Sequence, residues 1–264
     1  MGKSIVITSG KGGVGKTTFV TAVGRILRAQ NRSVALVDTD FGLNNLDVLL
    51  GVENRIVYDI IDVIENRCRL RQALVEDSEC KGLFVLPSAH TYDQSRVNAQ
   101  SIKAVVNSLK SGFDYVLIDS PAGIETGFHR AVCCADEAIV VSTPHLSALH
   151  DADKTIKIIK SYMLSKVSLV LNRVRGDKEC DGQTVSATDA STLLGVELLG
   201  VIPEDDKVNE MSTLSLALNS RSEGYKAMEM LCRKLINGKG EVYNPTKKYS
   251  GVLGAIRRKI KKII

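Results

Sequence analysis

A glycine-rich segment near the start of the chain has the residue types that hold a phosphate. It reads Gly10-Lys11-Gly12-Gly13-Val14-Gly15-Lys16-Thr17. This segment fits the pattern G-x-x-x-x-G-K-[ST], in which glycines let consecutive backbone N–H groups curl round an anion. We expect the Lys16 ammonium to reach the β- and γ-phosphates of a nucleotide and the Thr17 hydroxyl to coordinate Mg²⁺. A glycine-rich turn without a ligand is the alternative, which the preceding apolar run and the following helical pattern disfavour.

Carboxylates follow two other apolar runs. Asp38 and Asp40 come after the run 34–37, and Asp119 comes after the run 115–118. Ligands of open α/β sheets bind outside the carboxyl ends of strands, so these side chains are expected beside the glycine-rich loop. We expect Asp119 to hold Mg²⁺ through its water shell, with Asp38 as a second partner of the metal. Asp40 is the candidate for positioning the attacking water. Alternatively, Asp38 and Asp40 only cap their strand.

The elements that must position these residues alternate along the chain. Short runs rich in Val, Ile and Leu, without polar alternation, are typical of strands buried on both faces of a parallel sheet. These predicted strands are residues 4–8, 33–37, 83–86, 115–118, 138–142, 167–171 and 198–202. Helical patterns lie between them, at residues 16–30, 94–110, 124–135, 147–164, 185–194 and 220–237. The alternation predicts an α/β, three-layer P-loop NTPase fold with a mostly parallel, doubly wound sheet.

The pattern stops after residue 236 and predicts a division of the chain. Asn237-Gly238-Lys239-Gly240 breaks the last helix, and Asn244-Pro245 follows. We expect a nucleotide-hydrolysing domain over 1–237, a flexible linker over 238–250 and a separate element over 251–264.

Charge and hydropathy are ordinary except at the C-terminus. The chain has 264 residues, of which 44% are hydrophobic and 25% charged, as in globular proteins. The net charge is +5, but residues 247–264 hold seven Lys or Arg and no acid, so the rest sums to −2. No run of 18 apolar residues exists, so no membrane-spanning segment is expected.

The six cysteines are expected to be reduced thiols in a cytosolic protein, since they form no C-x-x-C pair. Cys133 and Cys134 are adjacent. They are interpreted as small apolar core residues; the alternative is an iron–sulfur cluster bridging two subunits.

The C-terminal segment 251–264 has the pattern of a basic amphipathic helix. Its large apolar residues fill one side of the helical wheel and are Val252, Leu253, Ile256, Ile260, Ile263 and Ile264. Its basic residues are Arg257, Arg258, Lys259, Lys261 and Lys262. The helix is too short for a hydrocarbon core of ~30 Å, so it would lie in the membrane interface. Docking on its own domain would use only the apolar side, and DNA only the cations. Anionic lipid uses both and is the prediction; nucleic acid is disfavoured.

The loop resembles the deviant Walker A motif, whose mark is the additional lysine in Lys11-Gly12-Gly13-Val14-Gly15-Lys16-Thr17-Thr18. The family with this motif includes MinD, ParA, the arsenite-pump ATPase and the nitrogenase iron protein. The resemblance implies that Thr18 belongs to the nucleotide site. It also implies an ATP-sandwich homodimer in which Lys11 reaches the partner's nucleotide, so Lys11, Lys16 and Asp40 form the expected catalytic set.

Longer matches narrow the resemblance to the MinD cell-division regulators. They are Asp38-x-Asp40-x-Gly42-Leu43-x-Asn45-Leu46-Asp47, Asp119-Ser120-Pro121-Ala122-Gly123-Ile124-Glu125-Thr126-Gly127, Ala135-Asp136-Glu137-Ala138 and Gly200-Val201-Ile202-Pro203-Glu204-Asp205. By this resemblance Asn172 and Arg173 flank the adenine, with Pro203 and Asp205 near the base. The amide of Gly123 would sense the γ-phosphate. The sequence departs from the family pattern at Thr39, at Asn44 and over 173–185, which is short.

The implied activity is a Mg²⁺-dependent ATPase in division-site selection. An ATP-bound dimer would bind anionic membrane on the cytoplasmic face, or in a plastid equivalent, and recruit a MinC-like inhibitor. Hydrolysis, stimulated by a MinE-like partner, would release it. The alternatives are a flagellar-number ATPase, a ParA-like partitioning ATPase and a scaffold that binds nucleotide without hydrolysing it.

Overall fold

The computed structural model describes residues 2–41, 45–89, 98–214, 219–251, 254–256 and 258; the side chains of 212–214 are not described. Asn44 and the tail residues Val252, Leu253, Arg257, Lys259, Ile260, Lys261, Lys262, Ile263 and Ile264 lie outside this part. The predictions made on them stay predictions.

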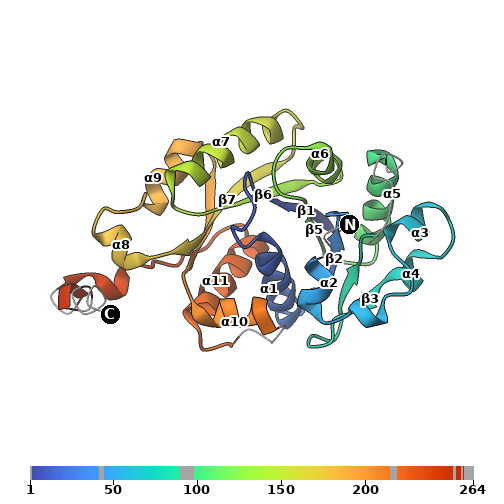
Figure 1. Ribbon diagram of the computed structural model, residues 1–264, viewed down its shortest axis with the longest axis horizontal. Helices are drawn as coiled ribbons and strands as arrows, with labels where there is room; N and C mark the ends of the chain where they lie inside the picture. The colour runs from blue at the N-terminus through green and yellow to red at the C-terminus, as the bar shows by residue number, and fades with distance from the viewer. Residues whose placement is uncertain are drawn as a thin grey trace.

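One eight-stranded sheet forms the middle layer (Figure 1). Its strands are β1 Lys3–Thr8, β2 Val34–Asp38, β3 Val75–Glu76, β4 Leu83–Leu86, β5 Tyr115–Asp119, β6 Glu137–Ser142, β7 Lys166–Val174 and β8 Glu197–Pro203. The strand order is β3-β4-β2-β5-β1-β6-β7-β8, with β3–β4 antiparallel and the other pairs parallel. The loop after β1 therefore leaves the middle of the sheet, between β5 and β6.

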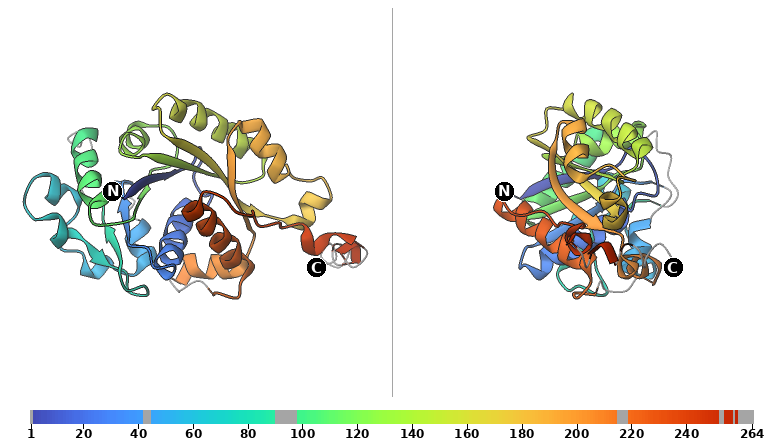
Figure 2. Two further views of the ribbon diagram at one scale, coloured as in Figure 1. Left: turned by 180° about the vertical axis from the view of Figure 1, so that it is seen from behind. Right: turned by 90° about the vertical axis from the view of Figure 1, so that its left-hand side faces the viewer.

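Helices cover both faces of the sheet, which gives three layers (Figure 2). On one face are α1 Lys16–Ala29, α2 Asn45–Leu50, α10 Asp206–Leu214 and α11 Glu223–Asn237. On the other are α3 Ile60–Ile64, α4 Leu70–Ala73, α5 Ala99–Lys110, α6 Thr126–Val132, α7 Leu146–Lys160 and α9 Ala187–Leu194. The remaining helical turns are η1 Glu53–Arg55, α8 Gly176–Cys180 and η3 Lys247–Tyr249.

Successive side chains of each strand point to opposite faces of the sheet and so contribute to two separate hydrophobic cores. In β1, Ile5 and Ile7 pack in the cluster beneath α1 and α11, while Val6 packs in the cluster on the opposite face. Both sets are buried, so these strands lack polar positions along most of their length. This explains why the seven predicted strands agree with the structure within one to three residues at their ends. The predicted α/β, three-layer fold is confirmed.

Several short elements were not predicted. These are β3, α2, α3, α4, α8 and α10, each of nine residues or fewer. α5 begins at Ala99, where the Asn98 side chain caps it by accepting a bond from the Ser101 amide. Residues 94–97 of the predicted helix lie outside the described part. In the described part of the chain, no helix has the length and apolar character needed to cross a membrane.

Residues 238–250, expected to be a flexible linker, lie against the domain. The Tyr243 hydroxyl donates to Glu223 Oε2 over 2.6 Å, and Tyr249 is buried. A Cβ on Gly176 would stand 2.1 Å from the Pro245 carbonyl oxygen, so this glycine lets the segment pass directly over α8. Figures 1 and 2 both show the last described helical turns, at the red end of the colour scale, beside α8.

A buried ion pair fixes the hairpin of β3 and β4 to α1. Arg25 donates to Asp77 through Nε at 2.7 Å and Nη2 at 2.9 Å, and the carboxylate is buried. We expect Asp77→Ala to lower the free energy of unfolding by about 2–4 kcal/mol, because it removes one partner of a desolvated pair. The control Asp153→Ala breaks the exposed pair with Lys157 on α7 and should cost at most about 0.5 kcal/mol. Urea unfolding measures both, and equal losses would contradict the assignment.

Candidate nucleotide and magnesium site

The glycine-rich loop joins β1 to α1 at the carboxyl edge of the sheet. Gly13 and Gly15 have φ angles of +78° and +89°, which residues with a side chain rarely adopt. Lys16 begins α1, so the free N–H groups of the first helical turn point toward the loop's hollow. The backbone has the curvature that the phosphate-binding pattern requires.

Asn172 holds the loop from β7. Its Nδ2 donates to the Val14 carbonyl over 2.8 Å, and a Cβ on Gly15 would stand 2.5 Å from the same nitrogen. Arg173, with a φ of +56°, is exposed beside it. The strand end thus positions one side chain under the loop and the next one outside it.

Residues assigned to the base line a narrow notch of about 20 Å³ beside the loop. Its lining includes Gly15, Thr18, Asn172, Arg173, Pro203 and Asp205. Asp205 is fixed by bonds from the Gly224 amide at 2.7 Å and the Lys207 amide at 2.9 Å. The structure therefore brings together the two chain segments that the resemblance places at the adenine. A base would need more room than this notch has.

Two carboxylates stand side by side beneath the loop. Asp38 and Asp119 are register partners on β2 and β5, and both are buried. The Lys16 ammonium makes an ion pair with Asp119. Burial, and next the charge of Asp119, raise the pKa of Asp38 well above its ordinary value. The Asp40 amide donates to Asp38 Oδ1 at 2.8 Å and opposes this shift.

These residues fit a divalent cation. One buried ammonium, Lys16, faces the two buried carboxylates of Asp38 and Asp119, so the cluster has an excess of negative charge and oxygen ligands. Oxygen ligands suit Mg²⁺, which keeps part of its water shell. Thr17 lines the adjoining hollow with a half-buried side chain.

Asp40 lines this hollow, which has a volume of about 460 Å³. Burial raises the pKa of Asp40, and the charge of Lys16 opposes the increase. The other lining includes the loop 12–18, Asn45 and Ala122. Asp40 is thus the carboxylate that borders the space next to the loop, while Asp38 and Asp119 lie beneath it.

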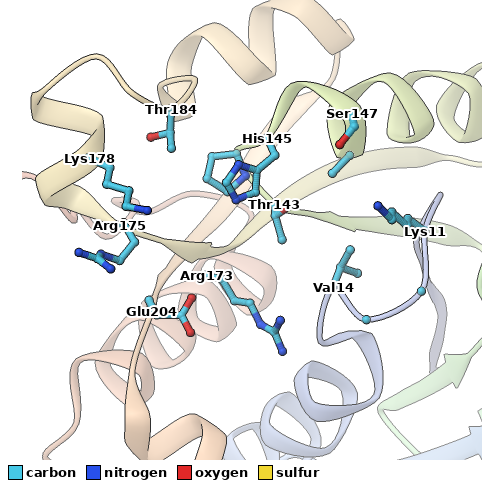
Figure 3. A pocket seen from close by; sticks show the side chains of 14 residues that line it. Lys11, Val14, Thr143, His145, Ser147, Arg173, Arg175, Lys178, Thr184 and Glu204 are labelled. Atoms are coloured by element: carbon cyan, nitrogen blue, oxygen red, sulfur yellow. The ribbon is translucent and has the colours of Figure 1, made fainter.

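Lys11 and Gly123 lie beside the loop in different surroundings. Lys11 is exposed and borders a hollow of about 560 Å³ whose far side holds Arg173, Arg175 and Lys178 (Figure 3). The Gly123 amide donates to the Ser9 carbonyl at 3.0 Å.

Some site contacts have no signal in the sequence. The Thr39 hydroxyl donates to the Asp119 carbonyl over 2.7 Å and the Thr39 amide to the same oxygen at 3.0 Å. Thr39, where the sequence departs from the family pattern, therefore links the end of β2 to the end of β5 beside Asp38 and Asp119. The basic side chains of Arg175 and Lys178 were also missed, because they follow the strand end in the divergent region.

The fold and the site together define a P-loop nucleotide-binding protein. The family model of the CobQ/CobB/MinD/ParA nucleotide-binding domain matches residues 5–215. The septum site-determining protein MinD of Synechocystis sp. is 46% identical over 208 residues, which are 79% of this chain and 78% of that protein.

Solved structures agree. The MinC:MinD complex of Aquifex aeolicus matches with a TM-score of 0.84 and 36% identity, over 91% of this chain and 98% of that one. MinD of Pyrococcus horikoshii, complexed with Mg-ADP, matches with a TM-score of 0.79 and 29% identity, over 89% and 96%. The chain belongs to the septum site-determining MinD proteins of the MinD/ParA family and is a magnesium-dependent ATPase.

Gly15 and Gly12 offer a matched test of the loop. We expect Gly15→Ala to lower the free energy of unfolding by about 2 kcal/mol or more, because a Cβ meets Asn172 and the φ is positive. Gly12→Ala has nothing within 4 Å of its Cβ and should stay within about 0.5 kcal/mol. Urea unfolding without nucleotide measures both. A Gly15→Ala protein as stable as Gly12→Ala would contradict the contact with Asn172.

Proposed function

We propose that the chain selects the division site by coupling ATP hydrolysis to reversible membrane attachment, with the residue roles expected from the sequence. The observation that supports this best is the cluster of Lys16, Asp38 and Asp119 beneath a loop whose mouth is bordered by Asp40. Lysine, glycine amides and acids there match the parts that phosphoryl transfer needs: charge stabilisation, metal ligands and a group beside the attacking water.

Lys16 exchanges its partner when nucleotide binds. In this structure its ammonium neutralises Asp119. Magnesium, bound with ATP, supplies positive charge that draws electrons from the transferring phosphoryl group. Thr17, Asp38 and Asp119 would hold that cation, whose charge would offset the excess negative charge of the two carboxylates, and the Lys16 ammonium would then face the β- and γ-phosphates.

Asp40 positions the attacking water. Its carboxylate borders the hollow next to the loop and has a raised pKa, so it can accept a proton more readily than an exposed aspartate. The Gly123 amide, now bonded to the Ser9 carbonyl, turns to the γ-phosphate when it is present. That change carries the nucleotide state to the segment leading into α6.

ATP joins two copies of the chain. Lys11 is exposed on the outer side of the loop, where it can cross to the nucleotide of a second copy. The Aquifex aeolicus relative was solved as a MinC:MinD complex. By similarity, we infer a homodimer that recruits a MinC-like inhibitor and is released by a MinE-like stimulator.

The tail attaches this dimer to membrane. The domain is 1–237, residues 238–250 connect it, and 251–264 form the amphipathic membrane-targeting helix. Ile256 is half exposed and Arg258 reaches back to the Tyr249 carbonyl at 2.5 Å and to Asp181 at 3.4 Å. One tail binds anionic lipid weakly, while two joined tails gain about 10²–10⁴ in avidity. The protein is thus cytoplasmic and peripheral on the inner face of the membrane, with the plastid equivalent as the alternative.

Asp40→Ala tests the hydrolytic assignment. We expect phosphate release to fall by about two orders of magnitude, because the water loses its positioning carboxylate. Dimer formation with Mg-ATP, measured by light scattering, should persist. Lys16→Ala, the comparison, should lose ATP binding and the dimer together. Turnover of Asp40→Ala within about threefold of the parent would exclude this role.

Vesicle co-sedimentation tests the tail. The chain with Mg-ATP should pellet with phosphatidylglycerol vesicles, and with ADP or no nucleotide it should stay largely in the supernatant. Ile260→Glu should abolish pelleting while phosphate release without lipid is unchanged. The matched control Leu193→Glu places the same change on an exposed leucine of α9 and should pellet normally.

Two outcomes would overturn this proposal. Equal pelleting of the parent in ATP and ADP would exclude a nucleotide-controlled attachment. ATP-dependent binding to duplex DNA instead of vesicles would favour the partitioning ATPase.

A further inference from the structure

Another hollow lies at the edge of the sheet opposite the nucleotide site. It has a volume of about 390 Å³, and its lining includes Lys103, Cys133, Asp136, Tyr162, Met163 and Ser165. Asp136 directly precedes β6 and Ser165 directly precedes β7. Both strands run parallel to β1, whose far end leads into the glycine-rich loop. The hollow is therefore separate from the site described above.

A pair of adjacent thiols stands at this hollow. Cys133 is half-buried, borders the hollow and caps the C-terminus of α6, while Cys134 is buried behind it. The two sulfurs are 3.9 Å apart. The Arg130 carbonyl lies within reach of both, 3.1 Å from Cys133 and 3.0 Å from Cys134, so each S–H can donate either to this carbonyl or to the other sulfur. The pair is thus one accessible thiol supported by one inaccessible thiol.

Neighbouring charges favour an anionic Cys133 sulfur. Asp136 is the acid that lines the hollow, and its carboxylate already accepts bonds from Lys110 at 2.8 Å and from the Ser4 amide at 2.8 Å. Lys103 is exposed and makes no ion pair with a carboxylate in the described part of the chain. Its ammonium is therefore available to a negative charge in the hollow.

The two thiols differ in how readily they lose a proton. A bond from the Cys134 S–H, together with the charge of Lys103, lowers the pKa of Cys133 to about 7, although burial opposes the shift. The same coupling raises the pKa of Cys134. Once deprotonated, the Cys133 sulfur no longer donates to the Arg130 carbonyl and presents its charge to the hollow that Lys103 also lines.

We propose that Cys133 is a thiol-exchange site that reacts with small disulfides carrying carboxylates. The Cys133 thiolate attacks one sulfur of the disulfide, the disulfide bond breaks, and the other half leaves as a thiolate that takes up the proton. The net change is a mixed disulfide on Cys133 and one free small thiol. Lys103 selects for the anionic carboxylates, and Cys134 stabilises the attacking thiolate.

The polarity and titration of this site depend on a small set of groups. Those around Cys133 are Lys103 of α5, His129 and Arg130 of α6, Cys134, Asp136, and Tyr162 after α7. Tyr162 is bonded through its hydroxyl to His129 Nδ1, and burial raises its pKa. With Asp136 bound by Lys110, the anionic thiolate is opposed by no other free carboxylate among the described residues.

Reaction of the full chain with glutathione disulfide, followed by peptide mass spectrometry, tests the proposal. At pH 7 Cys133 should be modified faster than Cys180, whose thiol is exposed but lacks these neighbours. The rate at Cys133 should rise through a midpoint of about 7 and then level off. Cys133→Ser should remove this adduct. Cys134→Ala, which deletes the supporting S–H, should move the midpoint up by about one pH unit.

Lys103→Gln separates charge selection from simple access. It should slow glutathione disulfide, which is anionic, by about two- to threefold and leave cystamine, which is cationic, unslowed. Unchanged thermal unfolding shows that each variant is folded. The proposal is overturned if Cys180 reacts faster than Cys133 at pH 7, or if Cys134→Ala leaves the pH profile unchanged. Equal slowing of both disulfides by Lys103→Gln would refute the selection of anions.

Discussion

The ion pair between Lys16 and Asp119 is the interaction on which the nucleotide site depends. It lies at the centre of the sheet edge, where β5 and β1 run side by side and α1 begins. Removing one partner of such a desolvated pair commonly costs about 3–5 kcal/mol, because the other charge stays buried. The Lys16 ammonium can stay buried because the neighbouring carboxylates of Asp38 and Asp119 are buried as well and stabilise its positive charge. These buried charges would destabilise an ordinary apolar core, but here they form a site that suits a cation and a polyphosphate.

The strands and the main helices could be predicted because their cause is local. Runs such as Val34-Ala35-Leu36-Val37 are buried on both faces, so the sequence has no polar alternation to confuse the assignment. β3 and α2–α4 could not be predicted, since they are short and are held by tertiary contacts. The capping box of α3, between Asp59 and Asp62, was present in the sequence, but five residues are too few to show helical periodicity.

The parts of the site that consist of local motifs could be predicted from the sequence. The parts that depend on contacts between distant segments were harder to predict. The glycine loop and Asp119 could be predicted from their spacing in the sequence, whereas the role of Asn172 was predicted only from the family resemblance. Its bond to the Val14 carbonyl joins residues far apart in sequence. The bond from the Gly123 amide to the Ser9 carbonyl uses main-chain atoms that any residue has. A pattern of side chains in the sequence cannot predict a contact of that kind.

The divergent region 173–185 and the segment 238–250 form one feature. α8 begins at Gly176, the position where Pro245 approaches most closely, and Asp181 just after α8 faces Arg258. Arg175, the residue before α8, pairs with Asp177 and borders the same hollow as Lys11. A short series of residues thus connects Arg173, beside the glycine-rich loop, with the start of the tail. The region that departs from the family pattern thus contacts the C-terminal segment, and these contacts hold the start of the tail against α8. In the proposed membrane-bound dimer, a fixed root would restrict where each tail can reach, which would raise the effective concentration of the second tail once the first has bound.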